Sequence, residues 1–217
     1  MKRSLTALAA VLLGVSMFGA GAAQATVVSY DFVFEFSGGD EPAGPAPWLN
    51  ATFDDGGSAG SVNLTLSTAG LVDDEFVRQW YFNVEPFQTI NFTHQSGEVP
   101  TSTQSSSNAF KADGDGFFDI LIEYAANAAD RFGAGLQSVL LLEAAGLTAD
   151  MFQALSLGAG NSPDGLLAAA KVQGIGPNAD GSGWVAPIPI MGALPLLLSA
   201  LGLLGFAGGW WRRWLSD

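Results

Sequence analysis

The chain of 217 residues contains no cysteine, one histidine and only eight lysine and arginine side chains. The absence of cysteine excludes disulfide bonds, lipid attachment to a cysteine and thiol catalysis. With His94 as the only histidine, any catalytic triad would have to use that residue. The scarcity of basic side chains disfavours binding to nucleic acid and to anionic lipid. A folded domain in this chain must therefore be stabilised by its apolar core.

Carboxylates, in contrast, are abundant. The chain has 21 aspartate and glutamate residues, and 20 of them lie in residues 26–186 together with four basic residues, a net charge of −16 for that region. Such a surface favours solubility and can attract divalent cations or a basic partner. At about 160 residues, the region is long enough for one domain with a substantial core and short for two.

The N-terminal residues have the organisation of a secretory leader. Two basic residues precede an apolar stretch over residues 5–22, and the small residues Ala23 and Ala25 then flank Gln24. This order predicts a signal peptide over residues 1–25, helical in its apolar part, that enters the Sec translocon. Cleavage by signal peptidase after Ala25 leaves Thr26 as the mature N-terminus.

The C-terminal residues 185–217 have the organisation of a membrane anchor. Pro187, Ile188 and Pro189 precede an uncharged apolar run over residues 190–209, and Arg212 and Arg213 follow it. A helix of about 20 residues spans roughly 30 Å, the thickness of the bilayer core. The two arginines favour a cytoplasmic C-terminus. We therefore expect a transmembrane helix over residues 190–209, with the preceding domain outside the cytoplasm.

This tail resembles the C-terminal sorting signal of the PEP-CTERM family, which has a Pro-x-Pro motif, a transmembrane helix and a terminal arginine cluster in that order. Ile188 stands where the commonest form has glutamate, so the motif is more similar to the VPLPA variant. Tryptophans also dilute the arginine cluster. The resemblance implies an exosortase-like membrane protease/transpeptidase as partner, transient anchoring in the inner membrane, and delivery to the cell envelope or extracellular matrix. The alternative is a plain anchor that no enzyme processes.

The region between the two terminal segments, residues 26–184, reads as short strands separated by turns rich in glycine and aspartate. Apolar and polar residues alternate in most of the segments, which is typical of strands with one buried face. The pattern predicts an all-β fold, an antiparallel β-sandwich or jelly roll whose aromatic side chains pack against a second sheet. The Ser/Thr-rich residues 96–108 are expected to form a mobile loop, and residues 147–155 one helical turn capped by Thr148. The expected strands are 28–36, 48–53, 61–67, 76–84, 89–95, 117–124, 136–143, 166–173 and 184–185.

Asp113, Asp115 and Asp119 place three carboxylates around two glycines. A flexible turn of this kind can offer several oxygens to Ca²⁺. The spacing departs from an EF-hand, because Phe117 and Tyr124 stand where further ligands would be needed. The alternative is a tight hairpin turn, in which Asp and Gly are favoured for their backbone conformations.

Two patterns bear on catalysis. Residues 56–60 fit the G-x-S-x-G expression around Ser58, but an alternating strand follows them where a nucleophile elbow needs a helix. Asp54 and Asp55 are a carboxylate pair of the kind that glycoside hydrolysis uses, although sequence alone does not show them facing a substrate. Neither pattern supplies a complete catalytic set.

We therefore predict a non-enzymatic envelope or extracellular-matrix protein without a required cofactor, structural or associated with exopolysaccharide. A lectin-like module that binds carbohydrate or calcium is the first alternative. A hydrolase is the second.

Overall fold

A computed structural model describes residues 24–160, 162 and 165–188. Within them the chain forms twelve strands and one short 3₁₀ helix, and every strand pair is antiparallel, which confirms the predicted all-β class. The strands are β1 (Val27–Glu35), β2 (Leu49–Asp54), β3 (Ser61–Ser67), β4 (Phe76–Phe82), β5 (Asn91–Gly97), β6 (Ser102–Lys111), β7 (Gly116–Glu123), β8 (Phe132–Gly133), β9 (Gln137–Glu143), β10 (Leu157–Gly158), β11 (Ala168–Ile175) and β12 (Gly181–Pro187). The 3₁₀ helix η1 covers Ala149–Phe152.

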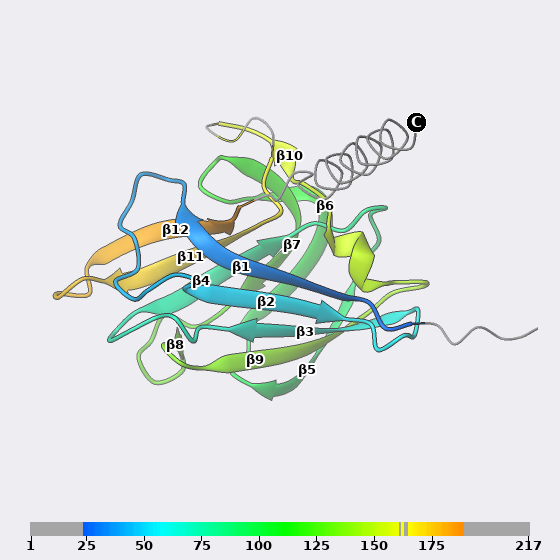
Figure 1. Ribbon diagram of the computed structural model, residues 1–217, viewed down its shortest axis with the longest axis horizontal. Coiled ribbons are helices and arrows are strands. Elements are labelled where there is room, and N and C mark those ends of the chain that lie inside the picture. The colour runs from blue at the N-terminus through cyan, green and yellow to red at the C-terminus, as the bar shows by residue number, and fades with distance from the viewer. Residues whose placement is uncertain (1–23, 161, 163–164, 189–217) are drawn as a thin grey trace, which may run out of the picture.

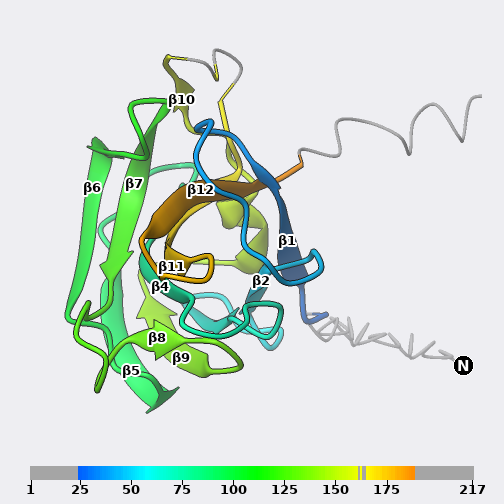
Figure 2. The same ribbon diagram turned by 90° about the vertical axis from the view of Figure 1, so that its left-hand side faces the viewer.

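Hydrogen bonds join these strands into one sheet instead of the two separate sheets of a sandwich. The order is β10-β7-β4-β11-β12-β1-β2-β3-β9-β5, with β6 on the other side of β7 and β8 against β4. Figure 1 shows the long strands crossing the molecule, and Figure 2 shows the sheet curled around its interior. In Figure 2, β6 and β7 lie on one side and β1 and β2 on the other. Curling lets one sheet cover both sides of its own core.

Two strands that follow each other in sequence, β5 and β6, lie at the two ends of this sheet. A hydrogen bond from the Ile90 N–H to Ser105 Oγ (3.2 Å) joins the segment before β5 to β6, and Ser105 Oγ lies 3.4 Å from the Gln88 carbonyl. The two ends of the sheet are therefore held near each other by side-chain contacts as well as by the connecting chain.

The interior is filled by the side chains that alternation predicted. On β1, Tyr30 and Phe32 are buried, and so are alternate residues of β2, β3 and β9. Phe53 lies at the centre of an aromatic group, stacked on Phe152 at 4.2 Å and edge-on to Phe82 at 5.2 Å between ring centroids. Phe152 belongs to η1, so this short helix is attached to the sheet by its aromatic side chain.

A second apolar cluster lies apart from the main core. Tyr81 and Trp184 pack against each other there, and Phe118 and Leu121 of β7 belong to the same cluster. Both faces of this part of the sheet are therefore apolar, which explains the almost continuous run of buried residues in β7, from Phe118 to Ile122.

The polar segment 96–108 is a strand for most of its length and not the expected loop. β6 pairs with β7, and most of its side chains are exposed on both faces. A strand with neither face buried has no apolar alternation, so periodicity cannot detect it. The predicted helical turn over residues 147–155 is confirmed as η1, with Thr148 at its N-cap position but without a side-chain cap hydrogen bond.

Both predicted membrane-directed segments fall outside the described residues. They are the apolar part of the leader and the helix over residues 190–209. Among the residues that the structure describes, no helix is long and apolar enough to cross a bilayer.

Candidate functional site

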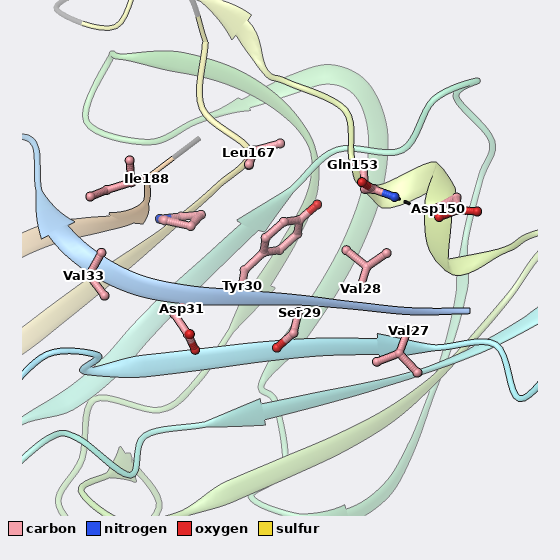
Figure 3. Close-up of a pocket in the computed structure, with 11 residues that line it drawn as sticks. Val27, Val28, Ser29, Tyr30, Asp31, Val33, Asp150, Gln153, Leu167 and Ile188 are labelled. Carbon is pink, nitrogen blue, oxygen red and sulfur yellow. Dashed lines mark hydrogen bonds between the residues drawn. The ribbon is translucent and has the colours of Figure 1, made fainter. Parts of the chain in front are cut away.

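The candidate site is a groove of about 660 Å³ along the first half of β1. Its floor and one side come from residues 27–31 and 33 of β1. The other side comes from Asp150 of η1, from Gln153 directly after it, and from Leu167, Pro187 and Ile188 (Figure 3). The groove therefore lies between the start of β1 and the end of β12.

The groove exists because β1 has two partner strands along only part of its length. β2 pairs with β1 from Val27 to Phe32, whereas the ladder with β12 includes only Phe32, Phe34 and Glu35. From Val27 to Asp31, β1 has a partner strand on the β2 side alone. Pro187, the last residue of β12, is paired with Phe32. Since proline carries no N–H, it is a natural place for such a ladder to end.

Figure 3 shows the side chains of β1 alternating between its two sides. Val28 and Tyr30 point toward η1, and Ser29 and Asp31 point the other way, over β2. The Tyr30 hydroxyl donates a hydrogen bond of 2.8 Å to the carbonyl of Phe152, and burial raises the pKa of this hydroxyl. Tyr30 therefore acts as a structural link between β1 and η1, and it stays protonated at neutral pH.

Polar groups lie at both borders of the groove. At the end of η1, Nε2 of the C-cap residue Gln153 donates to Asp150 Oδ1 over 2.8 Å. On the outer side of the sheet, Asn50 Nδ2 donates to Asp31 Oδ1 at 2.8 Å and to Ser29 Oγ at 3.0 Å. None of the residues that line the groove is basic. The groove can thus offer the Gln153 amide and the Asp150 carboxylate beside aliphatic walls, a combination suited to a neutral, hydroxyl-rich ligand.

The three aspartates of the calcium hypothesis do not form one site. Asp113 is exposed in the turn with a positive φ of 49°, whereas Asp115 and Asp119 are buried. A Cβ at Gly160 would collide with Asp115 Oδ1, so this carboxylate lies against the backbone at Gly160. Within the described ranges, no group of three or more Asp, Glu or His side chains is placed to hold a metal ion. The alternative interpretation, a hairpin turn, fits the geometry better.

Asp119 has a structural role. Between Ser105 and Phe110, β6 carries four residues opposite the single residue Asp119 of β7. The Asp119 carboxylate accepts hydrogen bonds from the N–H of Asn108 (2.7 Å) and of Val84 (3.2 Å). One oxygen therefore binds the backbone of this bulge and the other binds the backbone just after β4, so the carboxylate joins two neighbouring segments.

The candidate catalytic residues lie apart. Ser58 belongs to the turn between β2 and β3, where its N–H donates to the Asp55 carbonyl at 2.9 Å. His94 lies within β5, opposite Leu140. No hydrogen bond between side chains of the described residues joins Ser58 to His94. The strand-turn-strand context predicted for Ser58 is confirmed, and it does not form a nucleophile elbow.

The carboxylate pair Asp54 and Asp55 caps a turn. Asp54 Oδ1 accepts the Gly56 N–H at 2.8 Å, and Asp55 Oδ1 accepts the Gly57 N–H at 2.9 Å. Asp55 is only 7% exposed. Two carboxylates engaged with their own turn are not poised on either side of a substrate.

The sorting and cleavage motifs are described only in part. Ala25 is exposed and lies just before β1, whereas Ala23 falls outside the described residues. Pro187 is buried at the end of β12, and Ile188 is 60% exposed. Pro189, Arg212 and Arg213 also fall outside the described residues.

The groove itself was missed by sequence reasoning. Its residues belong to three separate segments, and nothing in the local pattern of β1 shows that its β12 ladder stops at Phe32. The only available indication was the pair of prolines that follows the last apolar segment. No protein-family model matches the chain, and no curated protein or solved structure shows significant similarity to it.

Proposed function

We propose that this protein is a non-enzymatic domain of the cell envelope or extracellular matrix. In this proposal it is exported with a cleaved leader and sorted by its C-terminal signal through an exosortase-like enzyme. The main support is the position of the fold between the two predicted processing signals. The first strand begins at Val27, two residues after Ala25, and the last strand ends at Pro187, the first residue of the Pro-x-Pro motif.

The burial of β12 restricts where the tail can be processed. Residues 183–187 are buried, and β12 lies between β11 and β1 in the sheet. A protease needs an accessible, extended chain, and the first exposed side chain after β12 is Ile188. If the tail is removed from the folded protein, the new C-terminus should therefore lie at Ile188 or beyond.

Mass spectrometry of both termini tests the sorting proposal. The protein is expressed with its leader and tail in a host that has an exosortase-like enzyme, and it is recovered from the envelope and the medium. We expect an N-terminus at Thr26 and a C-terminus between Ile188 and the apolar run. An exported protein that still ends at Asp217 would refute processing and leave a plain anchor. A C-terminus before Pro187 would refute the argument from burial.

The groove supports association with exopolysaccharide as the molecular activity. Its aliphatic walls can contact the C–H faces of sugar rings, and Asp150 and Gln153 can accept and donate hydrogen bonds to hydroxyl groups. The negative charge of the domain makes a neutral glycan a better partner than a polyanionic one.

Co-sedimentation with purified host exopolysaccharide tests this activity. We expect Gln153→Ala to weaken binding, because it removes a polar group from the groove border. Gln104→Ala is the matched control, since Gln104 is exposed on β6 and does not line the groove. EDTA should have no effect, because the groove hydrogen-bonds its ligand without a cation. Equal binding by both variants would exclude the groove as the glycan site.

A further inference from the structure

The carboxylate of Asp55 has three backbone donors from three separate parts of the chain. Oδ1 accepts the N–H of Thr26 at 2.8 Å and that of Gly57 at 2.9 Å. Oδ2 accepts the N–H of Ala149, the first residue of η1, at 3.3 Å. Asp55 therefore links the start of β1, the β2–β3 turn and η1.

The Thr26 donor is held in a fixed position. The N–H of Asp55 donates back to the Thr26 carbonyl at 3.2 Å, so the two residues form a reciprocal pair. This pair extends the β1–β2 ladder by one position beyond Val27 and Asp54. The preceding residues Gln24 and Ala25 are both exposed. Removing them would leave the Thr26 nitrogen where it is.

In the precursor the Thr26 nitrogen is a neutral peptide N–H. Cleavage after Ala25, which is part of the proposed function, would turn the same nitrogen into an α-ammonium group. We infer that Asp55 is the receptor for the mature N-terminus, so that removal of the leader creates an ion pair between the Thr26 α-ammonium and the Asp55 carboxylate. The pair is largely buried on the Asp55 side, and it locks the first residue of the mature chain to the turn and to η1.

A charge-assisted hydrogen bond of this kind is shorter and stronger than a bond between neutral groups. The existing donors already favour the ionised carboxylate: hydrogen bonds from Thr26 and then from Gly57 lower the pKa of Asp55, and the smaller effect of burial does not offset them. An anion held ready in this way raises the pKa of an ammonium group beside it.

The sign of the pH dependence follows from that raised α-amine pKa. The ion pair contributes its full stability below the ordinary α-amine pKa of about 7.7–8.0, and the contribution is lost as the pH rises through the higher folded-state pKa. The other charged side chains on the elements around Thr26 are the carboxylates of Asp31 and Glu35 on β1, Asp54 on β2 and Asp150 on η1. Tyr30, whose pKa is raised by burial, stays neutral over the pH range in which the α-amine titrates.

The experiment measures the pKa of the Thr26 α-amine in the full-length protein after export and extraction in detergent. Trace acetylation with acetic anhydride at a series of pH values, read by mass spectrometry of the N-terminal peptide, gives the midpoint of amine reactivity. We expect a midpoint at least about one pH unit above the ordinary range, which means roughly four- to sixfold lower reactivity near pH 8 and about tenfold lower reactivity well below it. In urea the midpoint of the same protein should return to the ordinary range.

Two variants separate the ion pair from the general negative charge of the region. Asp54→Asn removes the neighbouring carboxylate, which caps only its own turn, and should leave the midpoint nearly unchanged. Asp55→Asn should bring it back to the ordinary range. A wild-type midpoint that is the same in the folded protein and in urea would overturn the inference even if the Asp55 variant fails to fold.

The N-terminal peptide itself reports on the proposed function. If it begins at a residue other than Thr26, the cleavage prediction fails and the ion pair is excluded with it. If it begins at Thr26 and the midpoint is ordinary, the ion pair alone is refuted and the export proposal stands.

Discussion

Replacement of Phe53 by alanine tests the description of the core and of η1. Phe53 is fully buried, and its ring contacts the rings of Phe152, Phe82 and Tyr30. Truncation of a buried phenylalanine costs about 3–5 kcal/mol. Loss of three aromatic partners places this site in the upper part of that range, because each such pair adds about 0.5–1.5 kcal/mol beyond the buried area.

The expected change is large enough for thermal denaturation followed by circular dichroism. For a domain of about 150–250 residues, 1 kcal/mol shifts the Tm by roughly 2–4 °C, so Phe53→Ala should lower it by about 8–20 °C. Phe87→Ala is the matched control, because this side chain is 39% exposed and its loss should change the Tm by about 2 °C at most. If the two variants lose similar stability, Phe53 does not occupy the centre of the core and the description of η1 is wrong.

Three further predictions concern hydrogen bonds and cations. Tyr30→Phe removes the donor to the buried Phe152 carbonyl and should cost about 1–3 kcal/mol in urea denaturation, and a loss below about 0.5 kcal/mol would contradict that bond. Burial raises the pKa of Glu35, but hydrogen bonds from Ser37, Trp184 and a neighbouring glycine outweigh it and lower this pKa below its usual value of 4.5. The stability that Glu35 contributes is therefore present above pH 4.5 and lost as the pH falls through the lower folded-state pKa. The stability difference between wild type and Glu35→Gln should shrink over that interval, and a constant difference would refute the linkage. Millimolar calcium should leave the Tm unchanged, since the Asp/Gly hairpin does not gather its carboxylates, and a rise of several degrees would restore the calcium hypothesis.

The strands that sequence reasoning located best have one face in the core. The expected strand over residues 61–67 coincides with β3, in which Val62, Leu64 and Leu66 are buried and alternate with polar residues. In such a segment, the alternation of apolar and polar residues shows which side chains face inward. β6 has no such alternation, because it lies at an end of the sheet and neither of its faces is buried.

The arrangement of the strands could not be obtained in the same way. Alternation shows that a second apolar surface must cover each strand, but it does not show whether that surface is another sheet or a distant part of the same one. The hydrogen bond from the Ile90 N–H to Ser105 Oγ links the two ends of the sheet. Nothing in the sequence around either residue predicts this contact. The predicted sandwich was therefore correct in its antiparallel all-β character and wrong in dividing the strands between two sheets.

The candidate sites likewise depend on tertiary structure that local sequence patterns do not show. The carboxylates at 113, 115 and 119 are close in sequence, yet a hairpin turn and a bulge direct them to different places. The groove depends instead on a difference in length between two ladders, which only the register of β12 against β1 reveals. The role of Asp55 depends on Thr26, 29 residues away in the chain, and on Ala149, 94 residues away.

The bulged, polar strand β6 has a consequence for how copies of the protein contact each other at high concentration. β6 pairs only with β7, and its outer backbone edge is a possible template for another molecule's strand. Its middle is a serine- and asparagine-rich segment without a buried apolar face, and the bulge held by Asp119 interrupts the straight edge at Asn108, whose φ is +49°. An interrupted edge with no apolar stripe is a poor starting point for amyloid-like stacking. Copies of the domain at high concentration would thus resist aggregation through this edge, in which Lys111 at its end is the only charged side chain.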